Sequence, residues 1–256
     1  MYILDVGQGD SILLRTAESA VLIDGGEPNQ GDGLVQRLRA LGVRRLDYVI
    51  NSHPHSDHYG GLTAVLEAIP VGALYMPDYP EALTPTVGSY FTFLDAVEDA
   101  SLTIITPKNQ QQLSLGSAVL TFLSVDNSEA SDLNACTLVC QVEHGTNRFL
   151  FCGDLDAKTE RAFVREDLLV PVTVLKCAHH GSSGSSCEPF LDVISPKYVA
   201  ISVGADNDYG HPAVGCLKRL SAYTNAIYRT DFDGDILFLS RNNVITVQTN
   251  MKVAYI

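Results

Sequence analysis

The chain has 256 residues, of which 46% are hydrophobic and 18% charged, a composition typical of globular rather than disordered proteins. Its formal net charge of −13 argues against a protein that coats nucleic acid non-specifically, although bound divalent cations would reverse the sign locally. The longest apolar runs have only strand length and the N-terminus carries no signal-peptide pattern, so we expect a soluble segment that makes no membrane contact itself.

Strand-like and helix-like segments alternate along both halves of the chain. Apolar residues at helical spacing and helix stop signals predict helices at residues 31–41, 61–69, 89–99, 156–165 and 213–223. Apolar runs between turn signals predict strands within 2–24 and near 46–50, 71–75, 101–105, 117–125, 172–177 and 198–203, with a hairpin over 135–151 and two or three closing strands. This alternation, without linker-like composition, indicates one α/β domain over residues 1–256 with mixed sheets covered by helices.

The stretch His53-Pro54-His55-Ser56-Asp57-His58 directly follows the predicted buried strand at 46–50. It holds three imidazoles and a carboxylate in six residues, and transition metals favour nitrogen ligands of this kind with a hard oxygen beside them. The alternative is a solvated loop that happens to be rich in histidine. We favour a metal site, because histidine is scarce and is the commonest metal ligand among side chains.

The spacing of this stretch resembles the HxHxDH motif of the metallo-β-lactamase superfamily. Further motifs follow in the order expected of that family: Leu4–Ser11, Leu22–Gly26, Phe151–Asp154, Leu175–Ser182 and Asn207–Pro212. Together they are similar to the metallo-hydrolase domain of ComEC/Rec2-type competence proteins. The resemblance covers nearly the whole chain and implies a four-layer αββα sandwich with the site at one edge.

This resemblance implies two divalent metal ions, Mn²⁺ or Zn²⁺, that share one carboxylate. His53, His55 and Asp154 would form the first position. The second position would combine Asp154 with Asp57, His58 and His179. Two cations about 3.5–4 Å apart can hold a hydroxide that attacks phosphorus and clamp both ends of a phosphodiester. We therefore expect Asp57 to be essential for catalysis.

The predicted hairpin limits which later residues can join this site. Antiparallel pairing places Asn134 near Asp154, whereas His144 sits at the turn, roughly 30 Å from Asn134 at about 3.3 Å per residue. Many superfamily members supply a further histidine ligand from this part of the chain. Here Asn134 occupies the corresponding place and is a poor ligand for a transition metal, so we expect the first metal position to be weakly occupied.

Some of these residues have structural alternatives. Asp154 could instead cap the helix that begins near residue 156. Of the neighbouring pair, we favour His179 as the ligand and His180 as a catalytic or substrate contact, although the sequence separates them poorly. Asp24 could orient a ligating imidazole or simply occupy a turn, and for Asp10 a structural role is favoured.

Two polar segments after the second half's strands are candidates for contact with a substrate phosphate. Ser185 precedes Glu188 by three residues, a capping-box pattern that predicts a helix to about Ile194. The free N–H groups at that helix start, beside His179, could cradle a phosphate, with Ser182 and Ser183 of the same Gly/Ser loop as further substrate contacts. His211, before Pro212 at another predicted helix start, could contact the same phosphate or act as a general acid.

These features favour a metal-dependent phosphodiesterase, and the resemblance implies a nuclease that degrades single-stranded DNA during DNA uptake. The alternatives are a phosphoesterase acting on a small or cell-wall-linked substrate, and a metal-depleted binding domain without catalytic activity. A β-lactam or thioester hydrolase would be expected to have the missing histidine ligand. As part of a ComEC-type protein the segment would be extracytoplasmic, and otherwise cytoplasmic; the sequence leaves the oligomeric state open.

Overall fold

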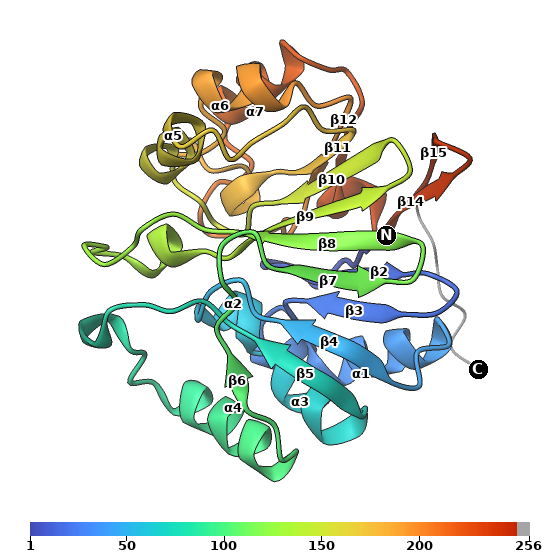
Figure 1. The fold of residues 1–256 in the computed structure, drawn as a ribbon, viewed down its shortest axis with the longest axis vertical. Helices are drawn as coiled ribbons and strands as arrows, with labels where there is room; N and C mark the ends of the chain where they lie inside the picture. Colours follow the sequence, from blue (N-terminus) through green and yellow to red (C-terminus); the bar gives the residue numbers. More distant parts are fainter. Residues whose placement is uncertain (250–256) are drawn as a thin grey trace.

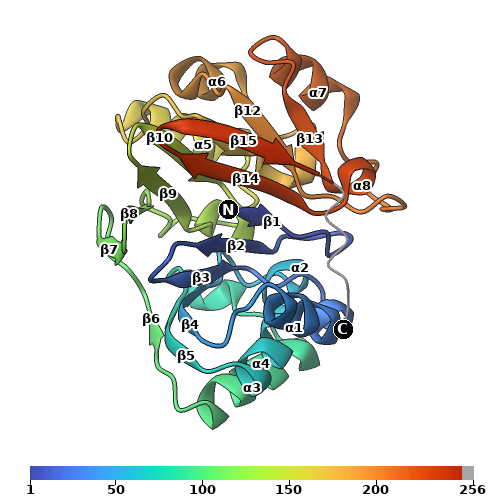
Figure 2. The same ribbon diagram turned by 90° about the vertical axis from the view of Figure 1, so that its right-hand side faces the viewer.

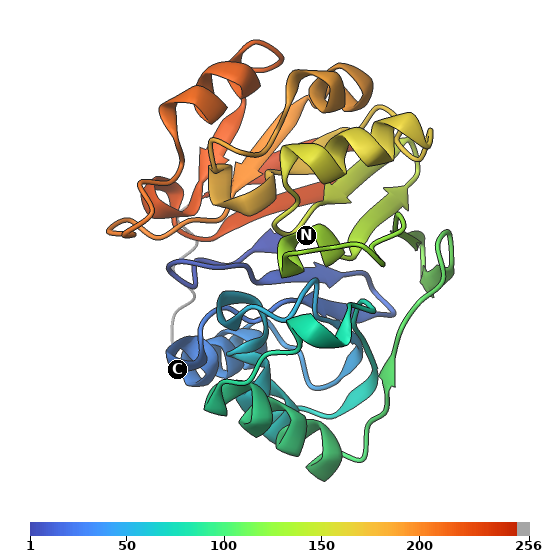
Figure 3. The same cartoon turned by 90° about the vertical axis from the view of Figure 1, so that its left-hand side faces the viewer.

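Two β-sheets lie face to face at the centre of the molecule, and helices cover the outer face of each sheet (Figures 1, 2 and 3). The computed structural model describes residues 1–249, so the last seven residues of the predicted domain 1–256 lie outside the described part. The four layers confirm the predicted αββα sandwich.

The first sheet has eight strands in the order β15-β14-β1-β2-β3-β4-β5-β6. Their bounds are Tyr2–Ile3 (β1), Ile12–Arg15 (β2), Ala20–Ile23 (β3), Leu46–Ile50 (β4), Val71–Tyr75 (β5), Ile104–Ile105 (β6), Ile236–Arg241 (β14) and Val244–Gln248 (β15). Strands β3 to β6 run parallel, whereas the pairs from β15 to β3 are antiparallel.

The second sheet has seven strands in the order β13-β12-β11-β10-β9-β8-β7. Their bounds are Gln112–Leu115 (β7), Ala118–Leu123 (β8), Val139–His144 (β9), Asn147–Phe151 (β10), Val174–Lys176 (β11), Tyr198–Ile201 (β12) and Ile227–Arg229 (β13). Strands β10 to β13 run parallel, and β7 to β10 pair antiparallel. Parallel strands end at the same edge of a sheet, so the loops after β3 and β4 gather together, as do those after β10, β11 and β12.

Helices form the two outer layers. On the first sheet lie α1 (Gly31–Ala40), α3 (Leu62–Ala68) and α4 (Gly88–Asp99), and on the second lie α5 (Ala157–Arg165), α6 (Glu188–Ile194) and α7 (Val214–Ser221). Short elements complete the chain: α2 (Ser56–Tyr59), α8 (Thr230–Asp233), η1 (Pro28–Gln30), η2 (Glu81–Leu83), η3 (Leu133–Cys136) and η4 (Ala178–Gly181). Within residues 1–249, none of the helices is both long and apolar enough to cross a lipid bilayer.

The layered core follows from the two-residue period of the strands. Ile23 and Ile50 point into the apolar layer between the two sheets. Their neighbours Leu22 and Val49 point to the opposite face and pack beneath the helices of the first sheet. Both faces of β3 and β4 are thus buried toward their carboxyl ends, which is why these strands are mostly apolar in the sequence.

Two local predictions differ from the structure. Strand β7 was not predicted, because its sequence Gln-Leu-Ser-Leu is short and half polar. The capping box at Ser185 is wrong: α6 begins after Cys187, and the Ser185 hydroxyl instead donates to the carbonyl oxygens of Ala178 and Ser182.

Candidate metal centre

Four side chains converge at the edge where the parallel strands end. Asp57 and His58 lie on α2, Asp154 follows β10, and His180 lies on η4 after β11, and one ligand atom from each lies within 4.8 Å of the others. His180 Nε2 lies 3.3 Å from Asp57 Oδ2 and 3.4 Å from Asp154 Oδ1. His58 Nε2 is likewise 3.4 Å from Asp154 Oδ1. We call these four residues the His/Asp cluster.

Hydrogen bonds behind the cluster turn the Nε2 atom of His58 toward it. His58 Nδ1 donates to Asp24 Oδ2 at 2.9 Å, which leaves the Nε2 lone pair facing Asp57 and Asp154. The Asp24 carboxylate also accepts bonds from the Ser52 backbone N–H at 2.7 Å and the Ser52 hydroxyl at 2.6 Å. Asp24 therefore lies where a residue that orients a ligating imidazole would lie.

His180 is fixed in the same way from the second sheet. Its Nδ1 donates to the Ser202 carbonyl oxygen at 2.9 Å and lies 3.4 Å from Asp10 Oδ1. Asp10 in turn forms an ion pair with Lys176, and both side chains are almost completely buried. His180 also adopts a left-handed backbone conformation, φ 50°, which non-glycine residues reach only at a cost of about 1–3 kcal/mol. Packing and hydrogen bonds must maintain that conformation.

The carboxylates of the cluster favour positive charge on the groups beside them. Burial disfavours the charged form of His58 and His180, but the nearby carboxylates outweigh burial and raise the pKa of both imidazoles well above the ordinary value. Burial likewise opposes ionisation of Asp154, yet the two imidazoles hold its pKa well below the ordinary value. These opposite shifts show that the two carboxylates favour positive charge at this point.

The donor set fits a divalent cation. Among the described residues, His58 Nε2, His180 Nε2 and Asp154 Oδ1 are buried and have no hydrogen-bond partner. Buried polar atoms almost always have a bonding partner. Three such atoms that converge on one point therefore indicate that they share a partner, such as a bound ion. Imidazole nitrogens combined with carboxylate oxygens suit the divalent transition metals.

The residues expected at the first metal position lie beside this cluster. The His53 ring packs against that of His58 with centroids 4.1 Å apart, and its Nε2 lies 3.0 Å from His55 Nδ1. Burial lowers the pKa of His53, so its ring is neutral. Asn134 lines the cavity above the cluster, and within residues 1–249 its Oδ1 has no hydrogen-bond partner.

A cavity of about 290 Å³ opens from the cluster to solvent. His179 stands in its wall with a side chain 30% exposed, and its Nε2 is 3.8 Å from Asp154 Oδ2. His211 packs edge-on against His179, with ring centroids 5.7 Å apart. Burial lowers the pKa of both rings, so they face the cavity as neutral imidazoles.

Comparison with known proteins shows the family. Residues 4–205 match the sequence model of the metallo-β-lactamase superfamily. This chain belongs to that superfamily. It is 34% identical to competence protein ComA of Neisseria gonorrhoeae over 94% of this chain and 32% of ComA. It is 29% identical to ComE operon protein 3 of Bacillus subtilis over 95% of this chain and 33% of that protein. The chain thus spans about a third of the length of these relatives.

Among solved structures, the fold is similar to that of CmlA, a diiron β-hydroxylase from Streptomyces venezuelae, with a TM-score of 0.58 at 16% identity. The match covers 89% of this chain and 52% of CmlA. At this identity the likeness concerns the fold alone. A shared sandwich does not determine the reaction, so the function of this superfamily member follows from the side chains of its site.

For this superfamily site, the geometry favours His180 over His179 as the fourth member of the cluster. The sequence interpretation chose His179, and the backbone explains the difficulty. Both residues have left-handed conformations, His179 with φ 50° and ψ 46° and His180 with φ 50° and ψ 24°, so no regular periodicity relates the directions of their side chains. We therefore predict His180 as the metal ligand and His179 as the substrate contact, the reverse of the sequence prediction.

The structure does not provide the free N–H groups that the sequence predicted at the end of the Gly/Ser loop. The N–H groups of Ser186 and Cys187 donate to the buried carboxylate of Glu160 at 2.6 and 2.7 Å, so they are not free for a ligand. Within the described chain, Ser182 and Ser183 are not among the residues that line the cavity. Asp154 does not cap α5 either, because Asp156 is the capping residue and accepts from the Thr159 N–H.

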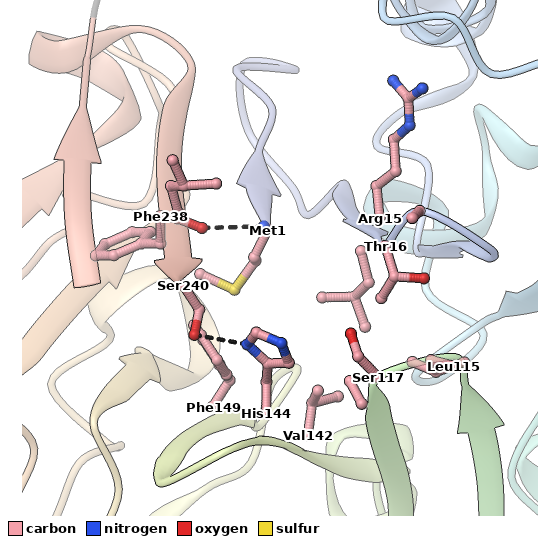
Figure 4. A pocket seen from close by; sticks show the side chains of 14 residues that line it. Met1, Arg15, Thr16, Leu115, Ser117, Val142, His144, Phe149, Phe238 and Ser240 are labelled. Atoms are coloured by element: carbon pink, nitrogen blue, oxygen red, sulfur yellow. Dashed lines mark hydrogen bonds between the residues drawn. The ribbon is translucent and has the colours of Figure 1, made fainter. Parts of the chain in front are cut away.

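His144 lies in a different place, as its position at the hairpin turn predicts. Its Nδ1 hydrogen-bonds the Ser240 hydroxyl at 2.8 Å beside a second cavity of about 290 Å³ (Figure 4). Met1 and Phe238 also line that cavity, and the Met1 nitrogen donates to the Phe238 carbonyl oxygen (Figure 4). His144 therefore provides a histidine outside the His/Asp cluster for use as a control.

Sequence reasoning missed several residues that support the cluster. Gly9 has φ +117°, and a Cβ placed there would lie 2.2 Å from the Asp57 carbonyl oxygen, so only glycine allows this close approach to α2. Lys176, a charged residue at the end of the apolar strand β11 and directly before Cys177 and Ala178, is a signal of a buried ion pair that could have been used.

Proposed function

We propose that this chain is a metal-dependent phosphodiesterase that cleaves single-stranded DNA, as part of DNA uptake of the ComEC type. The observation that carries the proposal is the set of buried, unpartnered Nε2 and Oδ1 atoms of the described His/Asp cluster, which converge below an open cavity. The similarity of this chain to competence proteins supports DNA as the substrate.

We propose two divalent cations, Mn²⁺ or Zn²⁺, held unequally. Asp57, His58, Asp154 and His180 would hold the tighter one. His53 and His55, together with a shared Asp154, would hold the weaker one, because the two histidines bond to each other and Asn134 contributes only a weakly coordinating amide oxygen. When bound, such cations provide a water activated for attack at neutral pH and positive charge for the reacting phosphate.

The chain's own residues would position the substrate around that centre. His179 and His211 stand in the cavity wall as neutral imidazoles, placed to donate a hydrogen bond to phosphate oxygens. His211 is placed to exchange a proton with the leaving oxygen, because its imidazole lines the same cavity as the His/Asp cluster. Asp24 keeps His58 in one tautomer throughout.

The test combines elemental analysis with cleavage of a single-stranded oligonucleotide in Mn²⁺ and in Zn²⁺. We expect Asp57→Ala to lower metal content and to reduce cleavage by about a hundredfold or more, because even residues that only orient a ligand change affinity or activity about 10- to 100-fold. His144→Ala, which removes an imidazole outside the cluster, is the matched control and should behave like the wild type.

Three results would contradict the proposal. Equal cleavage by the wild type and Asp57→Ala would exclude a role for the cluster. Cleavage restricted to chromogenic phosphodiesters would indicate a phosphoesterase for small or cell-wall-linked substrates. Stoichiometric metal without any phosphodiester cleavage would indicate a binding domain.

A further inference from the structure

An aromatic side chain stands exposed at the mouth of the cavity. Tyr209 lines the cavity, yet 70% of its surface is accessible to solvent. Its ring stacks on that of His211, with centroids 5.8 Å apart and an interplanar angle of 23°. His211 in turn contacts His179, so a column of rings leads from the surface down to the His/Asp cluster. One face of the Tyr209 ring lies against His211, and exposure leaves the other available to a ligand.

The loop that carries Tyr209 is held in place by one asparagine. Asn207 Nδ2 donates to the carbonyl oxygens of Gly204 at 2.8 Å and His211 at 2.7 Å. Asn207 Oδ1 accepts from the N–H groups of His211 at 2.9 Å and Tyr209 at 3.2 Å. The asparagine thus closes the loop on itself, and Tyr209 is presented in a fixed position. A ligand that stacks on Tyr209 would therefore lose less free energy in ordering the loop than it would on a flexible loop.

The charge around this ring favours stacking over ion pairing. Asp206 and Asp208 precede Tyr209, and the chain has a formal net charge of −13. A polyanion would therefore gain little attraction from the protein beyond the metal centre itself. Stacking on an aromatic face needs no positive charge, and it accepts any base because every base has a π-face.

We infer that Tyr209 is the platform on which an unpaired nucleobase stacks beside the scissile phosphodiester. The inference rests on the proposed function and specifies its substrate: a base is free to lie on Tyr209 only when it has left a duplex stack, so the site selects single strands. His211 serves both as the lower ring of the stack and as a contact to the phosphate.

The experiment measures binding separately from cleavage. Metal-loaded protein is titrated with a cleavage-resistant phosphorothioate oligonucleotide that carries the fluorescent base 2-aminopurine, and with a strand of equal length made of abasic residues. We expect Tyr209→Ala to weaken binding of the base-containing strand by about 10- to 100-fold, the effect of losing one stacked base. Tyr209→Phe keeps the ring and should bind within about twofold of the wild type.

Phe91→Ala removes an aromatic side chain, 52% exposed, from the helical layer on the first sheet and serves as the matched control. The wild type should bind the abasic strand weakly, and Tyr209→Ala should not weaken that binding further. Equal binding of the base-containing strand by the wild type and Tyr209→Ala would overturn the inference, as would an equal loss on both strands or no binding by the wild type. Binding through Tyr209 without cleavage of an ordinary strand would refute the proposed nuclease but not the platform.

Discussion

The ion pair between Lys176 and Asp10 offers the most direct test of how the cluster is supported. The two residues connect the sheets, because Asp10 follows β1 of the first sheet and Lys176 ends β11 of the second. Their side chains are 1% and 0% exposed. Removing one partner of a buried ion pair leaves the other charge uncompensated and typically costs about 3–5 kcal/mol. Lys176→Met keeps most of the apolar stem and removes only the charge.

We therefore expect Lys176→Met to lower the free energy of unfolding by about 3–5 kcal/mol. For a chain of this size, that corresponds to a fall in Tm of roughly 6–20 °C. The measurement is urea unfolding followed by circular dichroism, in chelator so that metal binding does not contribute. A double-mutant cycle uses Lys176→Met, Asp10→Asn and the variant with both changes. We expect the double variant to lose about 2 kcal/mol less free energy of unfolding than the sum of the two single losses.

The pH dependence follows from the directions of the shifts. Burial raises the pKa of Asp10, but Lys176 and His180 outweigh it, so its pKa lies below the ordinary value. A depressed carboxyl pKa contributes stability above the unfolded value of about 3.9, and this stability is lost as pH falls through the folded value. In Lys176→Met the positive charge that stabilises the Asp10 carboxylate is missing, so Asp10 should take up a proton more readily. The difference in the free energy of unfolding between the wild type and Lys176→Met should therefore become smaller as pH falls from 7 toward 4. A loss under about 1 kcal/mol, or strict additivity in the cycle, would refute this reasoning.

Three further expectations concern metal and backbone. A metal concentration about a thousandfold above its dissociation constant should raise the free energy of unfolding by about 4 kcal/mol, and this gain should disappear in Asp154→Asn, as thermal unfolding with and without chelator will show. Gly9→Ala should weaken metal binding at least about tenfold in calorimetric titration, because its Cβ would meet the Asp57 carbonyl oxygen and displace α2. Glu160→Ala should cost about 2–4 kcal/mol in urea unfolding, since the buried N–H groups of Ser186 and Cys187 lose their acceptors, while exposed Glu166→Ala should cost under about 0.5 kcal/mol.

The sandwich was predictable because most of its parallel strands are largely apolar runs bounded by turn signals, and their ends near the site are buried. Strands β4 and β5 lie at the residues that the pattern predicted. The HxHxDH stretch likewise predicted that its side chains lie close together, because Asp57 and His58 are neighbours on one short helix. Local sequence is sufficient where both the periodicity and the ligand spacing are local.

The remaining details depend on contacts between distant residues. Which of His179 and His180 faces the cluster is set by two left-handed residues and by the Ser202 carbonyl oxygen, which lies on the next parallel strand's loop. The N–H groups at the start of α6 appeared free in the sequence, but a carboxylate 26 residues earlier accepts from Ser186. In both cases the deciding partner comes from another element, and no spacing rule reveals it.

The same long-range contacts explain why the site can be both strained and ordered. The Ser202 hydroxyl donates to the Gly9 carbonyl oxygen at 2.7 Å, and the Gly204 N–H lies 3.3 Å from Gln8 Oε1, so the loop after β1 is tied to the ends of the second sheet. The Lys176–Asp10 pair joins these elements again in the buried layer beneath His180. Two like charges on Asp57 and Asp154 would push the sheets apart at this edge if they stood alone. A bound cation and these cross-sheet bonds act in the same direction, so metal binding and the docking of the two sheets should be thermodynamically coupled.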